Sequence, residues 1–417
     1  MKHRGLMFAI MYICAVFCSI SQLKIVPILG LIGESLAIDL GQIGWLMSVF
    51  TIAGIILAIP AGGLVGKFGP KKVFLAVMII TVLGNIVGVF GLDNYTVLLS
   101  SRILEGCGFA MASVAGIVLI NMWFPDKNTG LFVGIFVTFA AVASVVALNL
   151  ALPMVTSFGM ASVWWITALG TAIFTVLFWM FVKEASPQET PQGAEGVPAP
   201  SMTKPSIKRV LTSGPVLCIC LAQLTIGFFL YFYMNNYPQV FGAVYNLDAQ
   251  TANFYGSLNG LWGIPGCVFG GFLLDKLGKK GAPKLDLVCF AVMFVAAWIT
   301  TGLNENLYIL HTILTAVFPG LVLTAGNFLV PQIIRQPQDI GYGIGTLGLF
   351  YNIGIFVGNP IILSAVQATN DWAMASMILS AVSAFGFVMI LIYMAISRKD
   401  NPATAASDGS VTESVAN

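Results

Sequence analysis

The chain has 417 residues, of which 58% are hydrophobic and only 9% are charged, with 19 basic and 17 acidic side chains. A soluble domain places charge on about a quarter of its residues, so this composition excludes a soluble enzyme and indicates a protein whose solvent is lipid. The formal net charge of +2 is too small for a surface that binds nucleic acid, and no nucleic-acid partner is expected.

Twelve apolar segments are long enough to cross a bilayer, which requires about 20 residues of helix. The first runs from Leu6 to about Ile32 and is too long for the apolar part of a signal peptide. We therefore predict an all-α integral membrane protein whose twelve transmembrane helices lie at residues 6–32, 43–65, 73–92, 96–123, 130–154, 160–182, 214–240, 250–274, 283–303, 306–332, 340–366 and 372–397.

The basic residues predict the orientation of these helices. Of the 19 Lys and Arg residues, 17 precede the first span or follow an even-numbered span, and the loops on the other side contain acidic residues but no Lys or Arg. Basic loops stay in the cytoplasm. We therefore expect both termini to be cytoplasmic and the chain to be integral to the inner membrane of the cell. The two remaining basic residues, Lys24 and Arg102, lie within spans.

A polar segment rich in Pro, Gly, Ser and Glu separates the first six spans from the last six. It has too little apolar content to pack and is predicted to be a cytoplasmic linker. The predicted organisation is an amino-terminal six-helix half (1–183), the linker (184–209), a carboxy-terminal six-helix half (210–399) and a disordered cytoplasmic tail (400–417).

A motif of glycines and lysines occurs at the same place in both halves. GGLVGKFGPKK follows the second span and GGFLLDKLGKK follows the eighth, and Gly69 and Gly278 in them are 209 residues apart, almost half the chain. Glycine permits a tight turn, and the lysines keep that turn in the cytoplasm. We assign a conformational role to this loop motif, at Gly62, Gly69, Lys71, Asp275, Lys276 and Gly278.

At these residues the chain resembles the major facilitator superfamily, whose loop motif reads Gly-x-Leu-x-Asp-Arg-x-Gly-Arg-Lys after helix two and is often repeated after helix eight. The second copy keeps the aspartate as Asp275, whereas the first has Gly66 in that position. RILEGCG, from Arg102 to Gly108, is similar to the family's second motif. The resemblance implies a secondary transporter whose two halves rock around a central site. A finer resemblance, to the cyanate and nitroimidazole transporter subgroup, rests on Lys24 followed by Pro27.

Three charged residues lie deep within predicted spans, where a charge costs at least ~2.5–3.5 kcal/mol on insertion scales. Lys24, Arg102 and Glu105 fall at a similar depth, because a helix rises 1.5 Å per residue. In one interpretation, the two cations attract a small anion into a cavity; in the other, Glu105 pairs with one of them to hold helices together. Proton coupling is assigned to Glu105, whereas Asp286 is expected at the membrane interface.

Polar residues in the later spans complete the predicted site. Gln223, Tyr231 and Asn235 are separated by multiples of four residues and so share one face of the seventh span. The resemblance implies that spans one, four, seven and ten line the central cavity, although hydrogen bonds between helices would explain the same residues. The candidate substrate-binding residues are Lys24, Arg102, Gln223, Tyr231, Asn235, Asn327, Tyr351 and Asn352.

No nucleotide-binding loop, catalytic triad or metal-binding motif occurs in the sequence, so neither enzyme activity nor a cofactor or metal is expected. We predict a monomeric secondary active transporter that moves a small anion by alternating access, as anion/proton symport or as anion exchange. The expected partners are this substrate, the lipid bilayer and protons. One alternative is a transporter or exporter of a neutral or apolar molecule, and another is a membrane sensor that does not transport.

Overall fold

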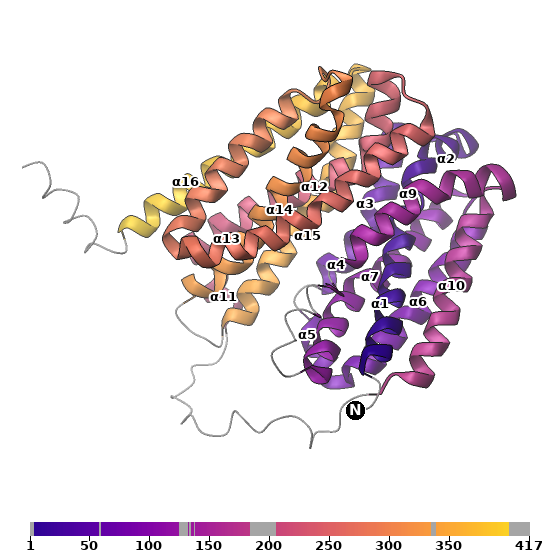
Figure 1. The fold of residues 1–417 in the computed structure, drawn as a ribbon, viewed down its shortest axis with the longest axis horizontal. Helices are drawn as coiled ribbons and strands as arrows, with labels where there is room; N and C mark the ends of the chain where they lie inside the picture. Colours follow the sequence, from indigo (N-terminus) through magenta and orange to yellow (C-terminus); the bar gives the residue numbers. More distant parts are fainter. Residues whose placement is uncertain are drawn as a thin grey trace, which may run out of the picture.

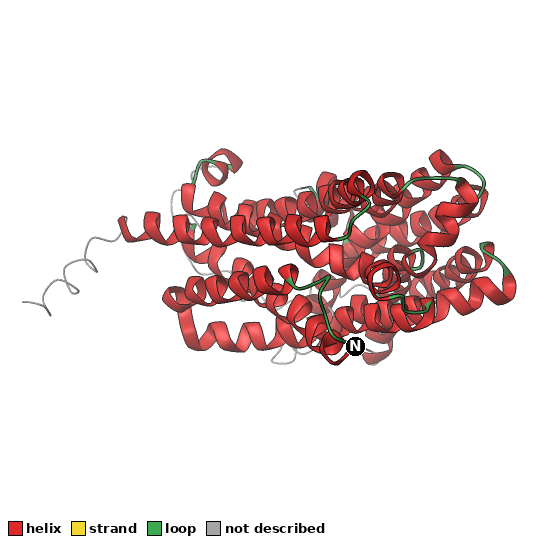
Figure 2. Ribbon diagram, turned by 90° about the horizontal axis from the view of Figure 1, so that it is seen from above, coloured by secondary structure: helices red, strands yellow, loops and turns green. Residues whose placement is uncertain are grey.

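The computed structural model describes residues 4–57, 60–124, 132, 135–136, 138–183, 206–334 and 339–399. Within these ranges every regular element is a helix, as Figure 2 shows, and twelve helical segments are long and apolar enough to span a membrane. The predicted all-α fold with twelve spans is therefore confirmed. The α-helices are α1 (Arg4–Leu23), α2 (Leu29–Leu36), α3 (Leu40–Ser48), α4 (Ile52–Leu57), α5 (Ala61–Phe68), α6 (Pro70–Phe90), α7 (Tyr95–Trp123), α9 (Phe139–Phe158), α10 (Ala161–Phe181), α11 (Ile207–Leu211), α12 (Gly214–Tyr245), α13 (Ala249–Trp298), α14 (Tyr308–Ile333), α15 (Ile340–Thr369) and α16 (Ala373–Lys399).

The first span is interrupted near a proline. After α1 ends at Leu23, the short 3₁₀ helix η1 (Val26–Ile28) leads into α2. Pro27 has no amide hydrogen, so the hydrogen-bond ladder of α1 cannot continue through it. This interruption places Lys24 immediately after α1, with its side chain completely buried.

The helices form two bundles that lie side by side in Figure 1, α1–α10 in one and α11–α16 in the other. Each bundle has a hydrophobic core of its own, and the amino-terminal core also includes Tyr231 and Ile355 of the other half. Of the predicted linker (184–209), residues 184–205 lie outside the described residues, as does the predicted tail (400–417), and α11 begins at Ile207.

The lysine-rich turns and the acidic turns lie at opposite ends of the helices. We call the end that carries Lys71 and Lys279 the basic end, and the end that carries Asp93 and Asp248 the acidic end. Lys71 donates a hydrogen bond to the carbonyl of Trp179 at the end of α10 (3.3 Å), and Lys279 donates one to Gln332 near the end of α14 (2.8 Å).

The two halves pack closely near the acidic end. A Cβ atom on Gly44 of α3 would lie 2.9 Å from the Cα atom of Pro360 on α15, so the backbones approach more closely than any larger residue allows. One turn nearer the acidic end, the Gly41 N–H donates to Oε1 of Gln367 at 3.1 Å. The α3–α15 contact therefore closes the space between the halves on this side.

Both copies of the loop motif turn at a glycine with positive φ. Gly69 has φ 85° between α5 and α6, and Gly278 has φ 60° within α13, a backbone region that L side chains rarely adopt. Lys276 Nζ lies 4.4 Å from the ring of Phe272. Gly62 and Asp275 also belong to the predicted motif, but the surroundings of both residues lie outside what the structure describes.

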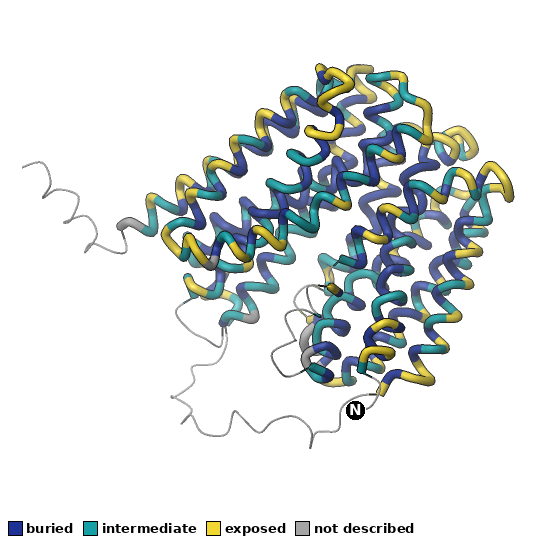
Figure 3. The backbone as a smooth tube through the Cα atoms, in the orientation of Figure 1, coloured by how far each residue is buried: buried dark blue, intermediate teal, exposed yellow. Residues whose placement is uncertain are grey.

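The outer surface of the bundles is apolar. Large side chains such as Phe90 (71% exposed), Phe158 (78%) and Trp179 (65%) point away from the cores, and Figure 3 shows buried positions on the inner sides of the helices. In water such a surface would be unfavourable, whereas hydrocarbon solvates it. The chain is therefore an integral membrane protein.

An ion pair at the basic end fastens α11 to the carboxy-terminal half. Arg209 donates from Nε to Oδ2 of Asp339 at 2.7 Å and from Nη2 to Oδ1 at 3.1 Å, and the Ser206 N–H donates to Oδ1 at 2.9 Å. These hydrogen bonds hold the pKa of the Asp339 carboxyl below its ordinary value of 3.8, and the bond from Arg209 has a larger effect than the bond from Ser206.

We expect Asp339→Asn to lower the thermal stability of the purified protein at neutral pH. A carboxyl group whose pKa is lower in the folded state stabilises that state at pH values above its unfolded pKa. The difference from the native protein should therefore persist down to about pH 4 and disappear as the pH falls through the lowered pKa. Unfolding midpoints between pH 7 and pH 3 measure it. Asp93→Asn, which removes the same charge from an exposed turn, is the control, and the same pH-dependent difference in that variant would contradict the assignment.

Candidate functional site

Three ionisable side chains meet inside the amino-terminal half. Lys24 Nζ lies 2.7 Å from Oε1 of Glu105, and Arg102 Nη1 lies 2.5 Å from Oε2. Arg102 and Glu105 are three residues apart on α7 and so lie on one face of that helix. All three side chains are at most 1% exposed. One carboxylate therefore serves two cations, and this charge cluster (Lys24, Arg102 and Glu105) keeps a formal excess of one positive charge.

The end of α1 and Asn85 supply further acceptors for the charge cluster. Arg102 donates from Nη1 to the Ser21 carbonyl at 2.5 Å and from Nη2 to the Gln22 carbonyl at 2.8 Å. The last carbonyls of a helix have no partner within it and carry partial negative charge, so a guanidinium is well placed there. Lys24 donates to Oδ1 of Asn85 on α6, and Asn85 Nδ2 donates to Ser21 Oγ at 2.9 Å.

Two aromatic rings enclose the cations of the charge cluster. Lys24 Nζ lies 4.9 Å from the ring centroid of Trp164 on α10, and Cζ of Arg102 lies 4.8 Å from that of Phe50 in the 3₁₀ helix η2 (Val49–Thr51). Both rings are at most 1% exposed. A ring face attracts a cation electrostatically, so these rings stabilise the charges while excluding water from them.

A cavity of about 410 Å³ lies between the two halves. Its walls come from η2, α4, α5 and α7 on one side and from α12 and α15 on the other. On α15 it is lined between Ile344 and Ile355, nearer the basic end than the contact of Pro360 with Gly44. Within the described part of the chain, no charged side chain lines this central cavity.

Phe50 separates the central cavity from the charge cluster. It lines the cavity and lies against Arg102. Gly106, one turn after Arg102 on α7, also lines the cavity, and a Cβ atom there would lie 1.8 Å from the Phe50 carbonyl oxygen. Across the cavity, Tyr231 of α12 also lines it and belongs to the hydrophobic core of the amino-terminal half. The charge cluster is thus one side chain away from the cavity.

The predicted site residues fall into three groups. Tyr231, Tyr351 and Asn352 line the central cavity, and the Tyr231 and Tyr351 rings meet edge to face with centroids 6.1 Å apart. Lys24, Arg102 and Glu105 lie together behind its wall. The third group, Gln223, Asn235 and Asn327, neither lines the central cavity nor belongs to the charge cluster.

The packing of α12 explains why only part of its polar face reaches the cavity. A Cβ atom on Gly227 would lie 2.1 Å from the Tyr351 carbonyl, so α12 and α15 are in close contact at that level. Gln223, one turn further toward the basic end, is 1% exposed and lies against Gly326 of α14. Asn235 is buried, and Asn327 is exposed and donates to the Leu323 carbonyl.

Sequence reasoning missed several residues that contact the charge cluster. Asn85 is a polar residue inside an apolar span, and that signal could have found it. Phe50 and Trp164 carry no such signal, because aromatic residues are common throughout these helices. Asp286, which we expect at the membrane interface, is 2% exposed within α13, and its Oδ1 has no hydrogen-bond partner among the described residues.

The carboxy-terminal half contains a buried network without formal charge. The hydroxyl of Tyr237 lies 2.7 Å from Nδ1 of His311 and 2.5 Å from Oγ1 of Thr315. Nε2 of His311 lies 2.9 Å from the carbonyl of Ala296, so Nε2 carries the hydrogen and Nδ1 accepts. The imidazole is therefore placed as a neutral bridge between α12, α13 and α14.

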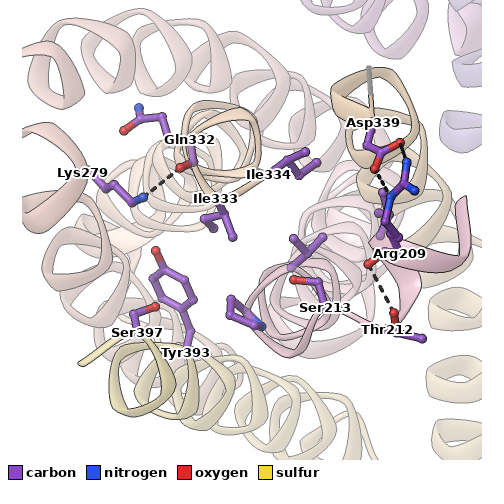
Figure 4. Close-up of a pocket in the computed structure, with 13 residues that line it drawn as sticks. Arg209, Thr212, Ser213, Lys279, Gln332, Ile333, Ile334, Asp339, Tyr393 and Ser397 are labelled. Carbon is purple, nitrogen blue, oxygen red and sulfur yellow. Dashed lines mark hydrogen bonds and ion pairs between the residues drawn. The ribbon is translucent and has the colours of Figure 1, made fainter. Parts of the chain in front are cut away.

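A second cavity, of about 610 Å³, lies at the basic end of the carboxy-terminal half. Figure 4 shows Lys279, Tyr393 and Ser397 on one side of it and the Arg209–Asp339 pair on the other. Because Asp339 neutralises Arg209 and Lys279 donates to Gln332, we assign this cavity no role in substrate binding. Among the described residues, no group of His, Cys, Asp and Glu could hold a metal ion.

Comparison with known proteins places the chain among membrane transporters. A family model described as Major Facilitator Superfamily matches residues 9–314. A "Probable galactarate/D-glucarate transporter" of Bacillus subtilis (strain 168) is 25% identical over 377 residues, which cover 82% of this chain and 82% of that protein. A "Probable sulfoacetate transporter" of Cupriavidus necator is 21% identical over 427 residues, which cover 98% and 97%.

A solved structure has the same fold. It is a bacterial homologue of the human lysosomal transporter Spinster, in an inward-facing and unoccupied conformation, and it matches with a TM-score of 0.75 at 14% sequence identity. The match covers 95% of this chain and 97% of that chain.

Glu105→Gln should destabilise the protein strongly, because Lys24 and Arg102 would remain buried without a counter-charge. Breaking a buried pair in this way costs about 3–5 kcal/mol. Lys24→Gln is the matched comparison, since it leaves Arg102 and Glu105 as a neutral pair, and its loss of stability should be clearly smaller. Thermal unfolding of the purified proteins in detergent measures both. Equal losses in the two variants would show that charge balance does not dominate here.

Proposed function

The chain belongs to the major facilitator superfamily, and we propose that it is a secondary transporter that moves a small organic anion across the cytoplasmic membrane by alternating access. Like the other members it is a transporter and not an enzyme. The distribution of Lys and Arg supports a cytoplasmic basic end, with both termini on that side.

The observation that carries the proposal is the formal positive charge directly behind the cavity wall. Lys24 and Arg102 share one carboxylate, and Arg102 lies against Phe50, which lines the cavity. The partial negative charge at the end of α1 offsets part of this excess. The remainder acts through a region that contains little water, where a Coulomb attraction is stronger than in bulk solvent. A carboxylate in the cavity would therefore be attracted to this wall.

The relatives support an organic acid as substrate. Galactarate, D-glucarate and sulfoacetate, after which two of them are named, are all anions at neutral pH. The resemblance of the Lys24 region to cyanate and nitroimidazole transporters stays a prediction. A substrate like that of the cyanate transporters would also be a small anion.

The arrangement of the halves supports alternating access. The α3–α15 contact closes the acidic end, whereas the cavity lies on the basic-end side of it. Rocking of the two bundles would separate α3 from α15 and expose the same cavity to the other side. The structure described above would then be the inward-facing state of the transporter.

Proton coupling is assigned to Glu105. Protonation would remove its negative charge and leave two cations to bind a substrate anion, so proton and anion would enter together. Anion exchange is the other mode that we retain, and it requires no change in the charge of Glu105.

The uncharged lining of the cavity favours a second candidate, a neutral or apolar substrate. In that case, Lys24 would serve only to hold α1, α6 and α7 together. A sensor that binds without transporting is a third possibility, and a lack of flux despite binding would identify it.

We expect a small carboxylate to stabilise the purified protein against heat, in a panel that also contains glucarate, sulfoacetate, cyanate and neutral analogues. A ligand at a hundred times its dissociation constant contributes about 2.7 kcal/mol. Lys24→Gln removes the excess charge and should weaken anion binding, roughly tenfold for each 1.4 kcal/mol of lost attraction. Lys284→Gln, an exposed lysine in α13, is the charge-matched control. Stabilisation of all three proteins by neutral compounds alone would exclude the anion proposal.

Proteoliposomes that contain a pH-sensitive dye distinguish symport from exchange. Addition of the stabilising anion outside should acidify the lumen, because each anion enters with a proton. Liposomes without protein report passive entry of the acid. If the lumen stays at constant pH while preloaded anion exchanges rapidly, the coupling role of Glu105 is wrong and exchange is the mechanism.

A further inference from the structure

The walls of the central cavity are mainly hydrocarbon. Phe50 and Phe109 form an aromatic corner, with ring centroids 5.7 Å apart. Leu57, Val114 and Ile344 extend this surface over the remaining wall. A volume of about 410 Å³ is within the usual range for a small-molecule site. The cavity therefore offers space for a compact apolar body.

Most polar side chains of the lining are already engaged with their own helices. Thr51 Oγ1 donates to the Ser48 carbonyl at 2.7 Å, and Asn352 Nδ2 donates to the Gly348 carbonyl at 2.8 Å. Ser113 Oγ donates in the same way to Phe109, at 3.3 Å. Such local bonds use a hydroxyl or amide hydrogen that would otherwise be available to a ligand.

The free hydrogen-bonding capacity of the cavity is consequently small. Among the described residues, the hydroxyl of Tyr351, the second hydrogen of the Asn352 amide and a few lone pairs remain. A sugar acid carries a hydroxyl on nearly every carbon, and each hydroxyl that enters the cavity exchanges its bonds to water for contact with hydrocarbon. A polyhydroxylated substrate is thus poorly matched to these walls.

Positive charge is available on one side only. Arg102, a member of the charge cluster, lies against Phe50, which lines the cavity. The opposite part of the lining, around Leu57 and Ile344, contains no charged side chain within the described residues. One carboxylate can be accommodated near Phe50, whereas a second at the other end of the cavity would find no counter-charge among the described lining residues.

We propose that the preferred substrate is a monocarboxylate with an apolar body, and not a sugar acid such as galactarate or D-glucarate, after which one of the relatives is named. Its carboxylate points toward Phe50 and Arg102, and its hydrocarbon body lies against Phe109, Val114 and Ile344. This inference rests on the proposed function, because it assigns the body of the same anion.

Hexanoate and gluconate test the inference directly, since both are six-carbon monocarboxylates and gluconate carries five additional hydroxyls. Binding to the purified full-length protein is measured by titration calorimetry, with hexanamide as the uncharged analogue. We expect hexanoate to bind at least tenfold more tightly than gluconate and than hexanamide. Equal affinity for hexanoate and gluconate, or tighter binding of gluconate, would overturn the inference and leave the anion transporter intact.

The uncharged analogue separates this failure from that of the proposed function. Hexanamide binding as tightly as hexanoate would overturn the proposed function, because the charge would then contribute nothing. If no compound of the three binds, the inference of an apolar monocarboxylate is wrong, and glucarate or sulfoacetate binding in the same protein decides whether the anion proposal survives.

A variant pair locates the preference in the cavity. Leu57→Gln places an amide of similar length in the wall and should reduce the preference for hexanoate over gluconate several-fold. Leu211→Gln makes the same change at an exposed position of α11 and should leave the preference as it is. An unchanged preference in Leu57→Gln would place the binding of these acids elsewhere in the protein.

Discussion

A single buried carboxylate determines how the amino-terminal half is put together. Glu105 binds Lys24 with one oxygen and Arg102 with the other, in a region that water does not reach. Separating any of these charges would leave an ion without a partner in a medium of low polarity. Because α1 stops at Leu23, its free carbonyls accept from Arg102 and the following lysine can turn inward. The interruption of α1 and the ion cluster are therefore one arrangement, and it holds α1 and α7 together as a rigid unit.

The two halves solve the problem of buried polarity differently. The amino-terminal half buries formal charges, whereas the carboxy-terminal half contains a neutral bridge in which Tyr237, His311 and Thr315 satisfy one another. Both networks lie within a bundle and not across the interface between bundles. Rocking of the halves would thus leave each network intact, whereas the α3–α15 contacts, such as Gly44 against Pro360 and the hydrogen bond from Gly41 to Gln367, would have to separate. Because neither buried network has to break, a large rigid-body movement of the two halves requires little free energy.

The sequence was sufficient for the fold but only partly for the site. Hydropathy predicts the spans because lipid requires about 20 apolar residues of helix, and the depth of Lys24, Arg102 and Glu105 predicted that they could meet. Their partners could not be predicted, because Asn85 and Trp164 belong to helices whose rotation is set by packing. The face of α12 illustrates the same limit. Its periodicity was correct, but Gly227 brings the backbone of α15 so close that Gln223 lies away from the central cavity.

A cation placed behind a cavity wall has a consequence for transport under the proposed function. A transporter must bind its substrate on one side and release it on the other, which requires that the two states differ in affinity. In the state described above, Phe50 stands between Arg102 and the cavity, so an anion there experiences the charge through an aromatic ring. Phe50 belongs to η2, between α3 and α4, and α3 is the helix that contacts α15. A movement of α3 away from α15 would carry η2 with it and alter how far Phe50 covers Arg102. The affinity for the anion would then depend on which end of the transporter is open, with the weaker binding on the side where Phe50 covers the charge and the substrate is released.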